Sequence, residues 1–202
     1  SALGGPTRHL GTFRSAFPHG LSWSPDGTLL ALPHSEHPED PSSLYLLSLE
    51  SGERRRLTRP PAGDFGDSQP RFSPDGRTLA FVRSLGLPES DIYLVPVDGE
   101  SERRLTVHDS YMEGLDWAAD GRSIVFSSLE SGLGLSPRLW RVQVPEGAAE
   151  PLEFGENGSR PTVSRKSGRL AYVRRAVSMD IWRVGGPSAS GEARSPTRCI
   201  SA

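Results

Sequence analysis

The chain has 202 residues, a formal net charge of −2 and a single cysteine, Cys199. This length suits about one domain, and the charge gives no bulk field that would favour nucleic acid or an anionic membrane surface. One cysteine excludes a disulfide within the chain and a cysteine-based zinc site. No apolar run of about 18 residues occurs, so the sequence predicts no membrane insertion by this segment.

Residues 1–18 are similar to segments that come later in the chain. The stretch Gly4–Thr12 parallels Ser51–Thr58 and Glu100–Thr106, each of which ends a repeated unit. We therefore expect an outer strand, near Arg8–Phe13, that belongs to a unit preceding the first complete one.

From residue 19 onward, a pattern of strand, tight turn and strand occurs four times. In the clearest copy, Ser73-Pro74-Asp75-Gly76 matches a type I turn, because Pro presets φ, Asp can bond the backbone and Gly tolerates a positive φ. The four turn glycines stand at positions 27, 76, 121 and 168. A period of roughly 40–50 residues with several strands per repeat is typical of a β-propeller blade.

Each repeat contains four short predicted strands. In the second repeat they lie near Pro70–Ser73, Thr78–Arg83, Asp91–Val97 and Glu102–Thr106. The middle strands are apolar on both faces and the fourth is rich in arginine, which favours a radial blade whose outer edge meets water. We therefore predict an all-β propeller with four-stranded antiparallel blades, about four repeats being present, as part of a six-bladed ring. The blades of this single propeller region are expected at residues 19–58, 66–106, 113–154 and 159–201.

Residues 19–186 resemble the TolB-type propeller repeat family. The resemblance is carried by Trp23–Gly27, Phe72–Gly76, Leu44-Tyr45, Ile92-Tyr93, and the Arg-Leu-Thr endings Arg56–Thr58 and Arg104–Thr106. Three further segments, Pro60–Pro70, Gly114–Trp117 and Met179–Val184, are similar to the propeller regions of acidobacterial signalling proteins. This likeness implies a non-catalytic binding or sensor module of a larger bacterial signalling protein, with a protein or small-ligand partner. Of the compartments, the periplasm is favoured over the cytoplasm.

The sequence holds few patterns that carry chemistry. It has no Gly-x-Ser-x-Gly elbow, His-Glu-x-x-His, phosphate loop or Cys-x-x-Cys, so we predict no catalysis and no cofactor. The segment His34–Asp40 groups two imidazoles with three carboxylates, but a proline-bounded loop gives ligands no regular geometry, and we interpret it as a solvated loop.

Two other recurring residue types have structural interpretations. The turn aspartates Asp26, Asp75 and Asp120 are expected to bond their own turns rather than calcium. The arginine runs are expected to form solvated faces of different blades; they are Arg54–Arg56, Arg103-Arg104 and Arg174-Arg175.

A set of polar residues stands four positions before the large residue that closes each first strand. The closing residues are Trp23, Phe72, Trp117 and Val163, and the polar residues are His19, Ser68, Glu113 and Ser159, with Gln69 beside Ser68. At the start of innermost strands, these side chains would line one mouth of the propeller channel. They are our candidates for contact with a ligand or partner, although a hydrated channel also needs polar side chains.

An alternative of a different class is the substrate-gating propeller domain of a prolyl-oligopeptidase-like hydrolase. In such proteins a separate α/β domain holds the catalytic triad. In either case the chain can be arranged in two ways. If Arg194–Ser201 is an outer strand, four blades and one extra strand do not close a ring neatly, and we expect self-association through open blade faces. If that segment is irregular, residues 8–13 would pair with the third strand of the last repeat, near Ile181–Val184, and close a small four-bladed ring; we favour the open fragment.

Overall fold

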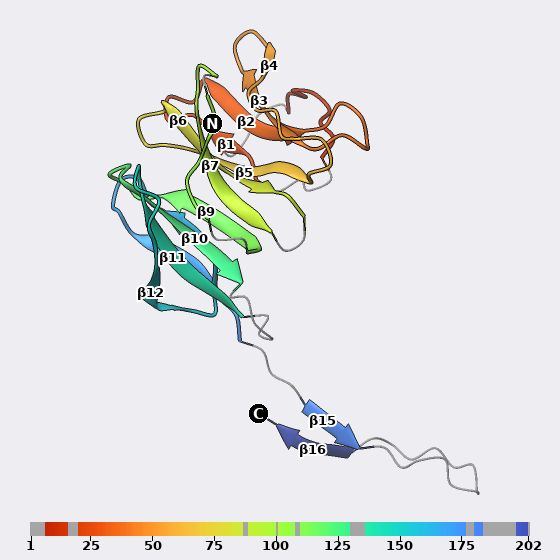
Figure 1. Ribbon diagram of the computed structural model, residues 1–202, viewed down its shortest axis with the longest axis vertical. Coiled ribbons are helices and arrows are strands. Elements are labelled where there is room, and N and C mark those ends of the chain that lie inside the picture. Colours follow the sequence, from red (N-terminus) through yellow and green to blue (C-terminus); the bar gives the residue numbers. More distant parts are fainter. Residues whose placement is uncertain are drawn as a thin grey trace, which may run out of the picture.

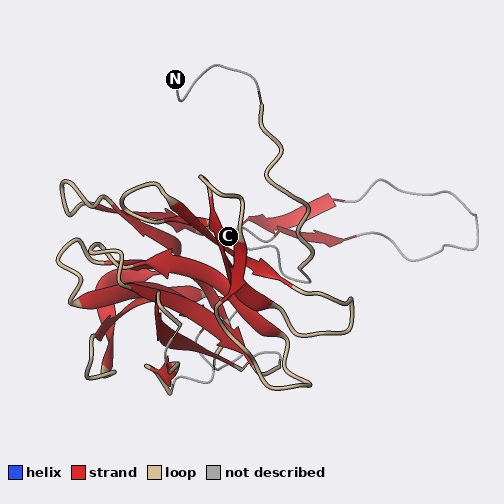
Figure 2. Cartoon of the chain, turned by 90° about the horizontal axis from the view of Figure 1, so that it is seen from above, coloured by secondary structure: helices blue, strands red, loops and turns tan. Residues whose placement is uncertain are grey.

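The computed structural model describes residues 7–15, 20–86, 89–99, 101–107, 110–129, 136–176, 180–183 and 197–201, the last two segments by their backbone alone. All regular structure in these residues is β-strand (Figure 2). Within these ranges there is accordingly no helix long and apolar enough to span a bilayer.

Three antiparallel sheets of four strands follow one another along the chain (Figure 1). Blade 1 comprises β1 (Ser22–Trp23), β2 (Leu29–His34), β3 (Ser43–Ser48) and β4 (Arg54–Arg56). Blade 2 comprises β5 (Gly66–Phe72), β6 (Thr78–Ser84), β7 (Ser90–Pro96) and β8 (Arg103–Arg104). Blade 3 comprises β9 (Met112–Trp117), β10 (Ser123–Leu129), β11 (Pro137–Gln143) and β12 (Ala149–Glu156). Within each blade, every strand pairs with the next one along the chain, which confirms the predicted propeller fold.

The fourth repeat departs from the expected single blade. Its strands β13 (Gly158–Val163) and β14 (Leu170–Arg174) form one two-stranded sheet, and β15 (Asp180–Arg183) and β16 (Thr197–Ser201) form another. Figure 1 shows the β15–β16 pair standing apart from the sheets. The expected outer strand at the end of the chain is present as β16, and it pairs with β15, the third strand of the same repeat.

The segment of residues 7–15 forms no strand, although an outer strand was expected near Arg8–Phe13. Its Phe13 packs against the apolar cluster Leu30, Leu32, Tyr45 and Leu47 on blade 1. The amide of Ser35 donates to the Arg14 carbonyl at 2.7 Å. The segment therefore covers part of the face of blade 1 that points away from blade 2.

The turns between first and second strands have the predicted geometry. The amide of Gly76 donates to the Ser73 carbonyl at 3.0 Å, and Gly76 and Gly121 adopt φ values of 74° and 70°. The carboxylate of Asp75 accepts from the Ser73 hydroxyl at 2.6 Å and from the Arg77 amide at 3.1 Å. These hydrogen bonds, the Ser73 bond above all, lower the pKa of Asp75, so the aspartate fixes the turn.

The apolar core lies between neighbouring blades rather than within one. Leu79 and Phe81 of β6 belong to the cluster shared with blade 1, whereas Ala80 and Val82 belong to the cluster shared with blade 3. This alternation follows from the two-residue period of a strand, because both faces of blade 2 are covered.

The residue that closes the first strand packs against the preceding blade. Phe72 and Trp117 are 0% and 4% exposed, which confirms the predicted buried anchors. The Trp117 indole Nε1 donates to the Arg71 carbonyl of blade 2 at 3.0 Å. Trp23, the equivalent residue of blade 1, is 54% exposed.

The Arg-Leu-Thr endings close each blade by hydrogen bonds. The hydroxyls of Thr58 and Thr106 accept from the amides of Leu44 and Ile92 at 2.8 and 3.0 Å. The arginine one residue before each ending motif is exposed, as expected, and also reaches the next blade. Arg55 donates to the Asp98 carbonyl at 3.1 Å and Arg103 to the Pro145 carbonyl at 3.3 Å. These two arginines therefore fasten neighbouring blades together.

A buried ion cluster adds a polar component to the core of blade 2. Arg83 lies 2.7 Å from both the Asp67 and the Glu102 carboxylates. The Arg83 guanidinium also lies over the Tyr93 ring, 4.8 Å from its centroid. Burial raises the pKa of Asp67 to about 6, although the hydrogen bonds from Arg83 oppose the shift. The cluster thus holds a carboxyl whose charge is costly in the folded state.

Candidate functional site

The innermost strands share a distortion at one equivalent position. In β5, β9 and β13 the pairing register shifts near residues 69, 113 and 160. The residue following each of the four predicted channel positions has a positive φ: Gly20 at 91°, Gln69 at 55°, Gly114 at 147° and Arg160 at 51°. Bulges of this kind re-aim side chains beside functional sites.

The bulges bring neighbouring inner strands into close contact. A Cβ atom built on Gly20 would lie 3.1 Å from the Gln69 Cα, and one on Gly114 would lie 3.0 Å from the Arg160 Cα. Glycine is required at positions 20 and 114 because both φ and space exclude a side chain. Around the inner edge, a glycine therefore alternates with a long polar residue.

A pocket of about 340 Å³ lies where these inner strands converge. We call it the mouth pocket; it is lined by Gly20, Gln69, Arg71, Tyr111, Glu113, Gly114, Arg160, Pro161 and Thr162. All four repeats contribute to it. Its volume is within the range of small-molecule sites.

The predicted site residues divide between the pocket and the sheets. Gln69 and Glu113 line the mouth pocket as expected. Ser68 and Ser159 are buried in β5 and β13, because the bulge follows them and turns only the next residue toward the pocket. His19 lies outside the described residues.

Hydrogen bonds hold the acidic and amide groups of the pocket. The side-chain amide nitrogen Nε2 of Gln69 donates to the Met112 carbonyl of blade 3 at 3.1 Å. Glu113 pairs with Arg175, whose Nη2 lies 2.8 Å from the carboxylate. Glu113 is therefore neutralised from outside the pocket, and its negative charge does not dominate the lining.

Arg71 was not predicted from the sequence as a site residue. Its Nη1 donates to the Pro70 carbonyl at 2.9 Å, which leaves most of its five N–H donors without a protein acceptor in the described chain. Burial lowers the pKa of Arg71, while the nearby charge of Asp116 opposes that shift. The place of Arg71 directly before the buried Phe72 was the available signal, since Thr162, at the equivalent position of the fourth repeat, lines the same pocket.

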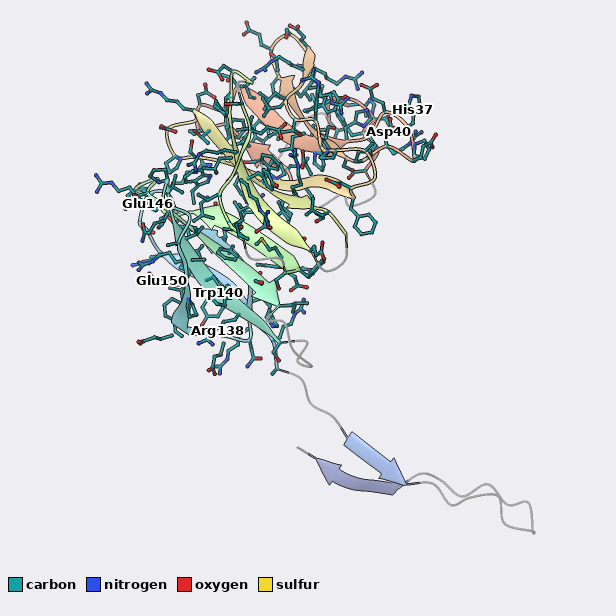
Figure 3. The ribbon with its side chains drawn as sticks, viewed as in Figure 1. His37, Asp40, Arg138, Trp140, Glu146 and Glu150 are labelled. Atoms are coloured by element: carbon teal, nitrogen blue, oxygen red, sulfur yellow. The ribbon has the colours of Figure 1, made fainter. Side chains whose placement is uncertain are left out.

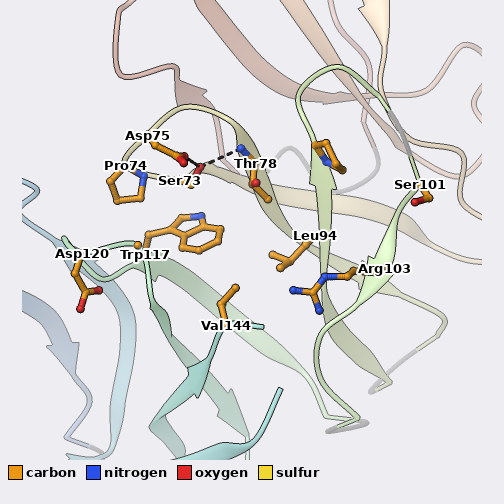
Figure 4. Close-up of a pocket in the computed structure, with 12 residues that line it drawn as sticks. Ser73, Pro74, Asp75, Thr78, Leu94, Ser101, Arg103, Trp117, Asp120 and Val144 are labelled. Carbon is orange, nitrogen blue, oxygen red and sulfur yellow. Dashed lines mark hydrogen bonds between the residues drawn. The ribbon is translucent and has the colours of Figure 1, made fainter. Parts of the chain in front are cut away.

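A second pocket, of about 440 Å³, lies between blades 2 and 3 near the turn ends of the strands (Figure 4). Trp117, Leu94 and Val144 supply its apolar surface, and Arg103 lies at its outer side. The Asp75 carboxylate at its edge is already bonded to the Ser73 hydroxyl, which in turn accepts from the Thr78 amide. This inter-blade pocket is a gap between the packed faces of blades 2 and 3.

The His34–Asp40 loop lies at the outer end of blade 1, where His37 and Asp40 are exposed (Figure 3). His34 packs edge-on between the rings of Phe13 and Tyr45, and the Tyr45 hydroxyl donates to Glu36 at 2.7 Å. Across the described ranges, no three His, Cys, Asp or Glu side chains come together as a metal site would need. Within the loop the Asp40 amide donates to the His37 carbonyl at 3.2 Å, while the side chains of His37 and Asp40 face solvent.

Residues 42–186 match the family model of the Tricorn protease N-terminal beta propeller domain. The chain is 39% identical over 106 residues to the uncharacterized peptidase YuxL of Bacillus subtilis, covering 50% of this chain and 14% of that protein. It is 34% identical over 159 residues to the uncharacterized protein Atu1656 of Agrobacterium fabrum, covering 77% of this chain and 50% of that protein. The chain therefore spans half or less of these relatives.

Among solved structures, TolB from Acinetobacter baumannii superposes with a TM-score of 0.64 at 28% identity. The match covers 77% of this chain and 37% of that one. Blade topology, the repeated turn and the match over residues 42–186 agree. The chain belongs to the TolB-like β-propeller proteins of the Tricorn N-terminal propeller family.

Proposed function

We propose that the chain is a non-catalytic binding or sensor module that takes a small ligand or a segment of a protein partner at the mouth pocket. The observation that carries this proposal is the convergence of three bulged inner strands, and of Gly20 before the first inner strand, on one pocket. Two of these strands place Gln69 and Arg160 at a positive φ, a conformation that non-glycine residues adopt at a cost and often at functional sites.

The composition of the pocket supports binding rather than chemistry. Among the described residues that line it, the one carboxylate, Glu113, is paired with Arg175, and none is a serine, cysteine or histidine that could act as a nucleophile or base. Loops and inner edges of a rigid scaffold are also where binding sites usually lie. Membership in a larger bacterial signalling protein remains part of this proposal.

Ligand-observed and protein-observed NMR with the 202-residue chain would test the proposal. A set of short peptides and small metabolite-like acids, amines and amides is added, and shifts of the Gln69 side-chain amide and the Gly114 amide are followed. We expect at least one compound to shift these signals saturably, and we expect the shift of the Gly114 amide to be lost in the double variant Glu113→Gln with Gln69→Ala. Saturable binding that maps only to the inter-blade pocket would contradict the proposal.

The gating propeller of a prolyl-oligopeptidase-like hydrolase is a second candidate, favoured by the 39% identity to a protein described as a peptidase. The coding sequence on either side of this segment separates the two. A downstream Gly-x-Ser-x-Gly domain supports the gate, whereas an upstream winged-helix or kinase region supports the signalling module. Peptidase assays of the whole gene product, with the elbow serine replaced as control, would then test the gate.

A further inference from the structure

Neighbouring inner strands are joined in two pairs through the residue that precedes an anchor. In blade 1 the Ser22 hydroxyl accepts from the Phe72 amide at 3.0 Å, and in blade 3 the Asp116 carboxylate accepts from the Val163 amide at 2.7 Å. Arg71 occupies the same place in blade 2. A guanidinium has no acceptor, so it cannot receive the next amide, and the Trp117 amide bonds to Asp116 instead.

Arg71 is therefore an exception to the linkage that its neighbours make. Its side chain lines the mouth pocket and makes a single hydrogen bond, to the Pro70 carbonyl. Asp116, the acidic group whose charge acts on it, is engaged by the Val163 amide, the Thr162 hydroxyl and the Trp117 amide. Arg71 makes no ion pair with any described residue.

Arg160 reaches the same pocket from the fourth repeat at a cost in backbone conformation. Its φ of 51° is one that glycine adopts freely, and the equivalent positions in blades 1 and 3 are the glycines Gly20 and Gly114. The Arg160 side chain is exposed and has no ion-pair partner in the described chain. A strained position that keeps a long cationic side chain points to a use for that cation.

We propose, resting on the proposed binding role of the mouth pocket, that Arg71 and Arg160 form a two-point site for an oxyanion group, a carboxylate or a phosphate, of the ligand. Guanidinium groups match the geometry of both anions and bond to them in pairs. Gln69 and the Tyr111 hydroxyl, which also line the pocket, are available as further donors. Glu113 stays paired with Arg175 and does not compete for the two cations.

The test uses ¹⁵N-labelled 202-residue protein titrated with glutarate, inorganic phosphate and the neutral isostere glutaramide. We expect glutarate or phosphate to shift the Gln69 amide saturably, with glutaramide at least tenfold weaker. Arg71→Ser places in blade 2 the hydroxyl that Ser22 supplies in blade 1. Arg160→Gly places at the positive φ a residue that adopts it without strain. Each should weaken anion binding at least tenfold without lowering the melting temperature, whereas Arg122→Ala, at an exposed turn, should leave binding unchanged.

The anion that binds more tightly identifies the class of the natural oxyanion. Absence of saturable binding by either anion, or equal binding in the double variant Arg71→Ser with Arg160→Gly, would overturn the oxyanion site. If glutaramide binds at the mouth pocket as tightly as glutarate, the oxyanion site is wrong while the proposed binding function stands. If both compounds shift only signals far from the pocket, both proposals are wrong.

Discussion

Trp117 and Trp23 occupy the same position in their repeats, yet one is buried and the other is half exposed. Trp117 packs against blade 2 and donates to the Arg71 carbonyl, whereas Trp23 is on the face of blade 1 that no described blade covers. Phe72 resembles Trp117, because it is buried in the contact between blades 1 and 2. The difference teaches that these anchors stabilise the contact between blades, and that a blade alone does not bury its own anchor.

The largest expected effect separates a covered anchor from an uncovered one. Phe72→Ala should lower the free energy of unfolding by about 3–5 kcal/mol, because it leaves a cavity in the contact between blades 1 and 2. Trp23→Ala removes a side chain that is half exposed and has no neighbouring blade over it, so it should change stability by about 1 kcal/mol or less. Urea denaturation followed by circular dichroism measures both, and similar losses for the two variants would contradict the comparison.

The ion cluster of blade 2 should make stability depend on pH. The pKa of Asp67 is raised from 3.8 to about 6 by burial, so its protonated form is the one favoured by folding. The stabilisation that comes from the raised pKa of Asp67 is fully present below about pH 4. It is lost as the pH rises through about 6, and the loss is about 2–3 kcal/mol. Urea midpoints between pH 4 and 7 measure it.

The pH dependence needs a variant in which only this carboxyl is removed. Asp67→Asn should flatten the fall in stability between pH 4 and 6, although it also weakens the bond to Arg83 at every pH. Asp120→Asn, at an exposed turn, should keep the wild-type slope. An Asp67→Asn curve parallel to that of the wild type would assign the pH dependence to other groups.

A smaller effect compares the same turn beside a neighbour and beside solvent. Gly27 and Gly76 have φ values of 75° and 74°, but a Cβ on Gly76 would lie 3.1 Å from the Pro25 Cδ and one on Gly27 would meet nothing within 4 Å. Gly27→Ala should cost about 1 kcal/mol through strain alone, and Gly76→Ala about 2 kcal/mol through strain and crowding. Equal thermal shifts in the two variants would show that the turns do not pack on one another.

Local chemistry made the turns and strands predictable. Ser73-Pro74-Asp75-Gly76 specifies its turn through residues that contact one another, and the alternation in β6 specifies two buried faces. The site was predictable in part, because Gln69 and Glu113 line the mouth pocket but Ser68 and Ser159 do not. A bulge shifts which residue reaches the channel, and its exact place depends on the neighbouring strand.

The remaining features depended on contacts that no single repeat contains. Arg55 and Arg103 resemble solvated arginines in sequence, and only the adjacent blade supplies the carbonyls that they bind. Ser22 and Asp116 each accept an amide from the next inner strand, and Arg71 does not. This difference is apparent only when the inner strands are compared in space. The fourth repeat has the expected strands, but whether they join in one blade is decided by tertiary contacts rather than by the repeat pattern.

The weakest expected effect is association of two copies through the uncovered ends. Leu21 and Trp23 are exposed at one end of the row of blades, and Phe154 and Val173 are exposed near the other. Within the chain, Phe72 and Trp117 each pack on the blade that precedes them. We therefore expect Trp23 of one copy to pack on the end of a second copy where Phe154 and Val173 are exposed. Such head-to-tail contact forms a ring only if the rotation closes, and the exposed apolar area is small, so the complex should form only at high concentration. Light scattering should give a mass that rises with concentration in the wild type, and Trp23→Glu should return it to that of a monomer. A mass that stays monomeric in the wild type at high concentration would show that the uncovered ends do not pair.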